Sequence, residues 1–105
     1  MIFIESPVFT ADVQKLLTDE SYANLQLHLA EYPFTSDLIK DTGGLRKIRW
    51  ASGGRGKSGG VRVIYFHVVA DAQIRMILIY KKGIKDDLTA KEKKVLRKLN
   101  EEWHR

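Results

Sequence analysis

Hydrophobic and polar residues alternate with two different periods along the chain, and the helical period comes first. Residues 1–5 are mostly apolar and end at Ser6 and Pro7, an order typical of a strand followed by a helix whose first position accepts proline. Apolar side chains then recur three or four positions apart until Pro33, with a polar break at Thr18 and Asp19. The pattern predicts an N-terminal strand and a helical hairpin. The apolar positions of its two helices are Phe9, Val13, Leu16 and Leu17, then Tyr22, Leu25, Leu29 and Tyr32.

A strand-like period follows a polar connection at residues 34–44, which contains Thr, Ser, Asp and a Gly pair. Three runs with strand-like patterns come next, at residues 45–50, 61–69 and 74–80. A tight turn at residues 71–73 joins the second run to the third, so we expect an antiparallel β-meander. Lys47 and Arg49 project from the same face of the first strand, because side chains two positions apart share a face.

The last segment predicts a C-terminal amphipathic helix. Thr89 and Glu92 have the spacing of a capping box, in which each side chain bonds a backbone N–H of the other residue. The apolar stripe of this helix is expected to comprise Val95, Leu96, Leu99 and Trp103, with Trp103 in the core. The chain is therefore predicted to form one α+β domain over residues 1–105, with an N-terminal strand and helical hairpin, a meander and a terminal helix.

Charge is segregated along the chain more sharply than the formal net charge of +5 indicates. Residues 1–41 hold two basic and seven acidic side chains, whereas residues 42–105 hold sixteen basic and six acidic ones. A one-sided basic surface favours a nucleic-acid partner, because cations that neutralise phosphates release counterions. On charge alone, a solvated basic surface is an equally good interpretation.

Composition excludes several other classes of chemistry. The chain has no cysteine, which excludes disulfides and thiolate chemistry, and its histidines His28, His67 and His104 lack the spacing of metal ligands. We therefore expect no metal and no cofactor. Residues 1–9 have no basic n-region and meet an acid and a proline, unlike a signal peptide, and no apolar run approaches the ~20 residues that span a bilayer. We expect a cytoplasmic protein with no membrane partner.

The segment at residues 43–65, GGLRKIRWASGGRGKSGGVRVIY, carries six basic residues and no acid around a glycine-rich turn. Residues 51–58 fit a relaxed phosphate-loop pattern, but such a loop needs a following helix, and here two glycines and a β-branched strand follow. A flexible basic hairpin loop is the better interpretation, in which Arg55 and Lys57 contact a bent phosphate backbone. A simple linker between strands is the alternative.

The order of these elements, together with the basic segment, resembles the RelE/ParE superfamily and, within it, the HigB-like toxins of type II toxin–antitoxin systems. Three features carry the resemblance, which covers nearly the whole chain: a TGGLRK-type start, a Gly- and Lys-rich loop, and an R-[VI]-I-Y strand. It implies a RelE-like fold and a ribosome-dependent mRNA endoribonuclease, an mRNA interferase. Such a toxin cuts mRNA in the ribosomal A site without a metal, using the 2′-hydroxyl as nucleophile, and so inhibits translation.

The resemblance also implies which side chains form the site. Carried over by position, the catalytic cations fall on Lys47, Arg49, Arg62 and Lys82. Cleavage by internal attack needs a base, cations that stabilise the pentavalent phosphorane and an acid for the leaving 5′ oxygen, and these four side chains supply the cations and the acid. Contacts to RNA and the ribosome are expected at Arg46, Arg55, Lys57, Lys81 and Lys85.

One position departs from the RelE pattern. Leu88 stands where RelE presents a tyrosine near the start of its last segment, and a leucine cannot act as a base. Tyr80, at the end of the last strand, is the candidate base in its place, with Tyr65 as a further candidate. Both tyrosines also fit an ordinary role as aromatic residues that pack on a sheet.

Two other functions fit the same sequence. The chain is also interpretable as a ParE-like DNA gyrase poison, because one fold supports several functions, or as a non-catalytic module that binds RNA or the ribosome. The expected partners of an interferase are the ribosome with its rRNA, mRNA and a cognate HigA-like helix-turn-helix antitoxin. We expect the free toxin to be a monomer.

Overall fold

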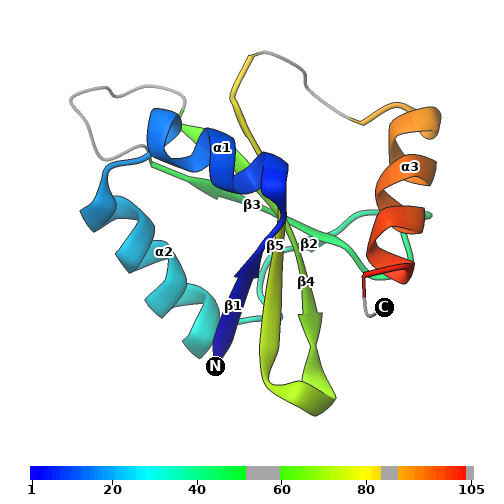
Figure 1. Ribbon diagram of the computed structural model, residues 1–105, viewed down its shortest axis with the longest axis horizontal. Coiled ribbons are helices and arrows are strands. Elements are labelled where there is room, and N and C mark those ends of the chain that lie inside the picture. Colours follow the sequence, from blue (N-terminus) through cyan, green and yellow to red (C-terminus); the bar gives the residue numbers. More distant parts are fainter. Residues whose placement is uncertain (52–59, 84–87, 104–105) are drawn as a thin grey trace.

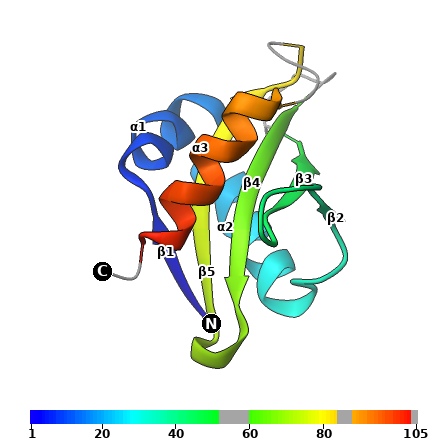
Figure 2. The same ribbon diagram turned by 90° about the vertical axis from the view of Figure 1, so that its right-hand side faces the viewer.

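The computed structural model describes residues 1–51, 60–83 and 88–103 and arranges them in three layers (Figure 1). A central sheet lies between α1 and α2 on one face and α3 on the other, and the perpendicular view shows α3 alone in front of the sheet (Figure 2). The described elements are β1 (Ile2–Glu5), α1 (Pro7–Leu16), α2 (Asp19–Glu31), β2 (Asp37–Leu38), β3 (Arg46–Trp50), β4 (Val61–Val68), a 3-10 turn (Val69–Asp71), β5 (Gln73–Lys81) and α3 (Ala90–Glu101).

The strands of the sheet lie in the order β1-β5-β4-β3-β2. β3, β4 and β5 pair antiparallel, which confirms the predicted meander. Two pairings were not predicted: β1 lies parallel to β5, with Ile2 opposite Gln73, and β2 extends the sheet beyond β3. β1 finds its partner only through the tertiary fold, and the two residues of β2 have no strand-like pattern of their own. Both pairings are therefore invisible to a local analysis of the sequence.

Side-chain caps begin each α-helix where the sequence predicted a start. The Ser6 hydroxyl accepts a hydrogen bond from the Phe9 amide at 3.1 Å, and Thr18 caps α2 in the same way. Thr89 and Glu92 form both bonds of the predicted capping box on α3. Ser6 also donates to the carbonyl of Ile77 at 2.8 Å, at the point where a register shift interrupts the pairing of β4 and β5. The cap of α1 therefore also satisfies a carbonyl at this irregularity of the sheet.

The larger core cluster lies between the sheet and helices α1 and α2. Two side-chain hydrogen bonds fasten α2 to the strands: the Tyr22 hydroxyl donates to Glu5 Oε2 at 2.6 Å, and Trp50 Nε1 donates to the Ser21 carbonyl at 3.0 Å. Burial, reinforced by Glu5, raises the pKa of Tyr22, so its hydroxyl remains a donor. The helical hairpin contributes to this cluster the buried side chains of Phe9, Val13, Leu25 and Leu29 and that of Leu17, which follows the last residue of α1.

The predicted apolar faces of α2 and α3 are wrong at three positions. The exposed side chains are Tyr32, Val95 and Leu99, with exposed fractions of 47, 56 and 42 %. Tyr32 lies just beyond the last residue of α2, so its side chain leaves the buried face of that helix. On α3, Leu96 and Trp103 pack against the second core cluster as predicted, but Asn100 is buried in place of its neighbour Leu99.

A buried guanidinium explains this orientation of α3. Arg75 on β5 is only 3 % exposed, and its Nη1 donates to the carbonyl and to Oδ1 of Asn100, at 3.1 and 2.9 Å. The same guanidinium lies 5.5 Å from the ring centre of Phe66 and 5.6 Å from that of Trp103. A cation is favourable at the C-terminal end of a helix and over aromatic rings. Asn100 therefore faces inward to contact Arg75, and Val95 and Leu99 face outward.

We expect Arg75→Met to lower the free energy of unfolding by about 2–4 kcal/mol, because it removes charge-assisted hydrogen bonds and two cation–π contacts while keeping an unbranched apolar stem. Urea denaturation followed by circular dichroism measures this loss. Arg97→Met is the matched control, because Arg97 is half exposed and its ion pair with Glu101 is worth under ~1 kcal/mol. Equal losses in the two variants would contradict the anchoring role of Arg75.

Candidate nucleic-acid interface

Three of the four predicted catalytic cations line one open pocket at the edge of the sheet that carries β2. Lys47 and Arg49 alternate along β3 and share a face, and Arg62 of β4 lies directly opposite Arg49 in the register. The pocket has a volume of about 470 Å³. Its remaining lining comes from β3, β2 and the segment before β2, namely Ile48, Asp37, Thr35 and Ser36.

The electrostatics of this pocket are unfavourable without a bound anion. Arg49 and Arg62 are a directly opposed pair of like charges, which destabilises a sheet. Within the described part of the chain, neither guanidinium forms an ion pair or a hydrogen bond. Asp37 is the one carboxylate among the described lining residues, against three cations. A phosphate group would relieve this repulsion, since guanidinium groups bind it in bidentate fashion.

The far wall of the pocket is held by two side chains that bond the backbone before β2. Arg46 Nη1 donates to the carbonyls of Phe34 and Ser36, at 3.2 and 2.7 Å. The Tyr65 hydroxyl donates to the Pro33 carbonyl at 2.9 Å and also bonds the Ser36 hydroxyl. Burial raises the pKa of Tyr65, so it remains a donor here. These contacts fix the segment that carries Thr35 and Ser36.

This arrangement changes the interpretation of Arg46 and Tyr65. Arg46 lies on the opposite face of β3 from Lys47, and carbonyl groups occupy its guanidinium. Its predicted contact with RNA stays a prediction, whereas its contacts in the structure support the pocket wall. Tyr65 is fully buried on the α1 and α2 side of the sheet, so its hydroxyl is not positioned to act as a base in the pocket.

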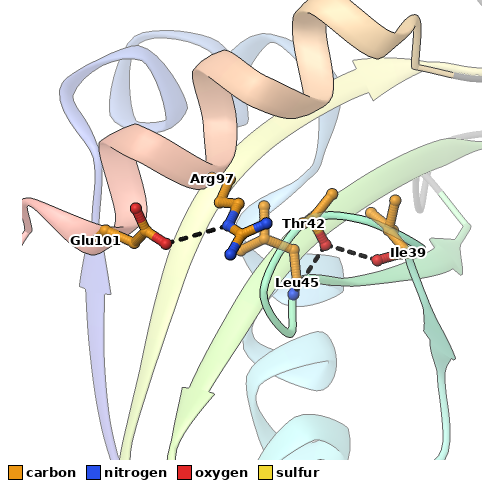
Figure 3. A network of polar contacts seen from close by, with 5 residues as sticks. All are labelled: Ile39, Thr42, Leu45, Arg97 and Glu101. Carbon is orange, nitrogen blue, oxygen red and sulfur yellow. Dashed lines mark hydrogen bonds and ion pairs between the residues drawn. The ribbon is translucent and has the colours of Figure 1, made fainter.

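A tight loop before β3 sets where Lys47 begins its strand. Thr42 Oγ1 donates to the Ile39 carbonyl at 2.6 Å and accepts from the Leu45 amide at 3.2 Å (Figure 3). Gly44 has a φ of 110°, and a Cβ there would lie 3.0 Å from the Phe66 ring, so the loop requires glycine. The Arg97 side chain of α3 lies over Gly43 and pairs with Glu101 at 3.1 Å. The TGGLRK sequence therefore encodes a structural turn that leads into the cationic strand.

Tyr80, the candidate base, lies opposite Arg62 in the register but does not reach the pocket surface. Its ring packs in the second core cluster with Leu45 and Leu88, and its hydroxyl oxygen is buried. Leu88, at the position of the RelE tyrosine, is also buried in this cluster. Neither side chain presents a base to the pocket that Arg49 and Arg62 line, and the role of Tyr80 stays a prediction.

Lys82, the fourth predicted catalytic cation, lies at the end of the sheet and does not line the pocket. Its amide donates to the Gly60 carbonyl at 3.2 Å, which places it beside the start of β4, two residues before Arg62. Lys81 pairs with Val61 in the register, and both lysines are exposed. The predicted contacts at Arg55, Lys57 and Lys85 lie outside the described residues.

The structure also tests three other features that the sequence raised: a phosphate loop, a metal site and a membrane-spanning helix. β3 and β4 pair antiparallel, which is incompatible with a phosphate loop between a parallel strand and a helix. No group of three or more His, Asp or Glu side chains suited to a metal ion occurs among the described residues. None of the described helices combines the length and apolar character needed to cross a bilayer.

The acidic and hydroxyl residues of the pocket were not predicted from the sequence. Thr35, Ser36 and Asp37 belong to a segment that was predicted only as a connection. The available signal was the density of hydroxyl and carboxyl side chains immediately before the cationic strand. That signal became informative only when β2 placed Asp37 directly opposite Lys47.

Comparison with known proteins defines the fold. No family model matches the chain. A chain of the intact RelBE toxin–antitoxin complex of E. coli is similar, with a TM-score of 0.61 and 15 % identity over 80 % of this chain and 98 % of that chain. The isolated E. coli RelE toxin gives a TM-score of 0.60 and 13 % identity over 93 % of this chain and 97 % of that one. The protein therefore has a RelE-like fold, as the sequence predicted.

We expect Thr42→Val to lower the free energy of unfolding by about 1–3 kcal/mol, because it leaves a buried amide and a half-buried carbonyl without their shared partner. The amide signal of Lys47 should shift in the NMR spectrum, since the loop leads into β3. Thr42→Ser is the matched control, because it keeps the hydroxyl and should retain most of the stability. A Thr42→Val protein as stable as the wild type would show that the turn does not depend on this bridge.

Proposed function

We propose that the protein is the toxin of a type II toxin–antitoxin system, of the HigB-like branch, and that it acts as a ribosome-dependent mRNA endoribonuclease. The observation that carries this proposal is the convergence of Lys47, Arg49 and Arg62 on one open pocket of a RelE-like fold. These are three of the four cations that the resemblance assigns to catalysis. The opposed guanidinium groups are the strongest single sign of a site for an anion.

The proposed reaction is internal attack on the RNA backbone. The 2′-oxygen attacks the adjacent phosphorus and forms a 2′,3′-cyclic phosphate, while the bond from phosphorus to the 5′ oxygen breaks. Arg49 and Arg62 bind the non-bridging oxygens and stabilise the extra charge of the phosphorane, and Lys47 orients the phosphate. Lys82, beside the start of β4, protonates the leaving 5′ oxygen. The cations favour the transition state over the ground state, because charge on the phosphate increases during attack.

The ribosome and an antitoxin are proposed as partners because the chain resembles RelE. Fold similarity at 13–15 % identity does not fix an activity, so the dependence on ribosomes rests on the resemblance of the basic segment to the interferases. The RelBE complex among the similar structures supports an antitoxin as partner. A HigA-like protein is the proposed antitoxin, and the free toxin is proposed to be a monomer.

A non-cleaving RNA-binding protein is the second candidate. Among the described residues that line the pocket, none is a histidine or a tyrosine, and the hydroxyl of Tyr80 is buried. A binding protein needs only the cations, whereas an enzyme also needs a group that accepts the proton of the 2′-hydroxyl. Measurements of cleavage and binding on the same variant separate these two candidates.

We expect Arg62→Ala to reduce cleavage of ribosome-bound mRNA by at least about 100-fold, because one donor to a transition-state oxyanion is worth about 10²–10³ in rate. Primer extension on translating ribosomes detects cuts in the A-site codon, and a parallel reaction on naked RNA tests the need for the ribosome. Lys15→Ala, which removes one positive charge from α1, is the matched control and should cleave like the wild type.

Ribosome binding by Arg62→Ala should persist, which co-sedimentation measures in the same samples. Wild-type protein that binds ribosomes without cutting mRNA would establish the non-cleaving candidate. Wild-type protein with no effect on ribosomes would overturn the proposal and direct the next assay to DNA gyrase.

A further inference from the structure

A second open pocket adjoins the first and shares two of its residues. Asp37 and Lys47 line both pockets, so the two form one continuous groove along β2 and β3. The second pocket has a volume of about 610 Å³. Lys40, from the loop after β2, and Lys93, from the first turns of α3, complete its cationic lining. The groove therefore joins three separate segments of the chain.

The second pocket combines positive charge with apolar surface. The side chains of Lys40 and Lys93 form no ion pair or hydrogen bond within the described part of the chain. Leu38, which is 60 % exposed, and Leu88 supply apolar contact area beside these cations. Nucleotides present the same combination, because each has a charged phosphate and a ribose and base with apolar faces. The chemistry of the pocket fits one nucleotide of a single strand.

Asp37 lies where the two pockets meet and divides their positive charge. It is exposed and lies directly opposite Lys47, on the face of the sheet that carries Arg49 and Arg62. A carboxylate repels phosphate, so it favours one phosphate on each side and a neutral group beside itself. In RNA the neutral group between two successive phosphates is a ribose, whose 2′-hydroxyl donates a hydrogen bond to a carboxylate.

We propose that this groove binds two successive phosphates of single-stranded RNA, with Asp37 accepting a hydrogen bond from the 2′-hydroxyl of the ribose between them. The inference rests on the proposed function, which places the scissile phosphate at Arg49 and Arg62. The attacking 2′-hydroxyl belongs to the ribose on the 5′ side of that phosphate. The strand therefore runs with its 5′ phosphate at Lys40 and Lys93 and its 3′ side away from α3.

This placement gives Asp37 a part in the reaction. The proton of the 2′-hydroxyl passes to the Asp37 carboxylate as the 2′-oxygen bonds phosphorus, the bond to the 5′ oxygen breaks, and Lys82 protonates the leaving 5′ oxygen. Asp37 then releases its proton to solvent, and Lys82 takes up a proton from solvent to replace the one that it gave. DNA lacks the 2′-hydroxyl that donates a hydrogen bond to Asp37, so the same contact selects RNA over DNA.

The first test compares a dinucleotide with and without a 5′ phosphate by NMR titration of the free protein. We expect the 5′ phosphate to tighten binding about tenfold in the wild type, as for a charge-assisted contact, and less than about twofold in Lys40→Ala/Lys93→Ala. Lys94→Ala/Lys98→Ala removes the same charge from the other side of α3 and should keep the full gain. Because cleavage is proposed to need the ribosome, the dinucleotide stays intact, which chromatography verifies.

A 5′-phosphate gain that survives in Lys40→Ala/Lys93→Ala would overturn the second phosphate site. A tightening by a 3′ phosphate that depends on these two lysines would overturn the proposed direction of the strand. If Arg62→Ala binds the plain dinucleotide as tightly as the wild type, the first pocket is not a phosphate site and the proposed function itself fails. Failure of the second phosphate site, failure of the strand direction and failure of the proposed function therefore give different results.

Two substitutions test Asp37. Asp37→Ala should lower the preference for the ribo- over the deoxyribodinucleotide by about three- to tenfold, because the acceptor is lost. Asp37→Asn keeps an acceptor, so it should keep most of that preference while losing cleavage on ribosomes. An unchanged preference in Asp37→Ala, or wild-type cleavage by Asp37→Asn, would overturn the role of Asp37 even if the Arg62 experiment supports the enzyme.

Discussion

The register between β3 and β4 is the constraint on which the cationic groove depends. Side chains alternate between the two faces of β3, so Ile48 and Trp50 pack against the cluster beneath α1 and α2 while Lys47 and Arg49 face the groove. A slip of one residue would exchange these faces and place two charges in the core. The cost of burying those charges selects the observed pairing, and the same pairing brings Arg62 opposite Arg49.

Buried and half-buried polar groups hold the segments that surround the groove. Thr42 closes the turn before β3, Tyr65 and Arg46 hold the wall before β2, and Arg75 fixes the end of α3. Each of these groups has hydrogen-bond partners, so its burial is not penalised by lost hydration. The cations of the groove are different, because Arg49 and Arg62 oppose each other without a described partner. A local violation of favourable electrostatics beside well-bonded polar groups is typical of a functional site.

Local chemistry was predictable from the sequence, whereas long-range placement was not. The capping box at Thr89, the helix end before Pro33 and the alternation at Lys47 and Arg49 rest on interactions within a few residues, and the structure agrees with each. The parallel partner of β1, the exposure of Leu99 and the position of Asp37 depend on segments far away in the chain. The cations of the site carried a sequence signal because they cluster within one segment. The carboxylate beside them carried none, because only β2 brings it there.

The pairing of β1 with β5 has a consequence for how the chain acquires its structure. Ser6 bonds the Ile77 carbonyl across 71 positions, and β5 is the one neighbour of β1 among the described strands of the sheet. During synthesis the N-terminal strand therefore emerges first and stays unpaired until nearly the whole sheet has left the ribosome. Such distant contacts form late and slow folding. The central sheet is thus complete only after β5 has left the ribosome, which delays any activity that depends on the finished sheet.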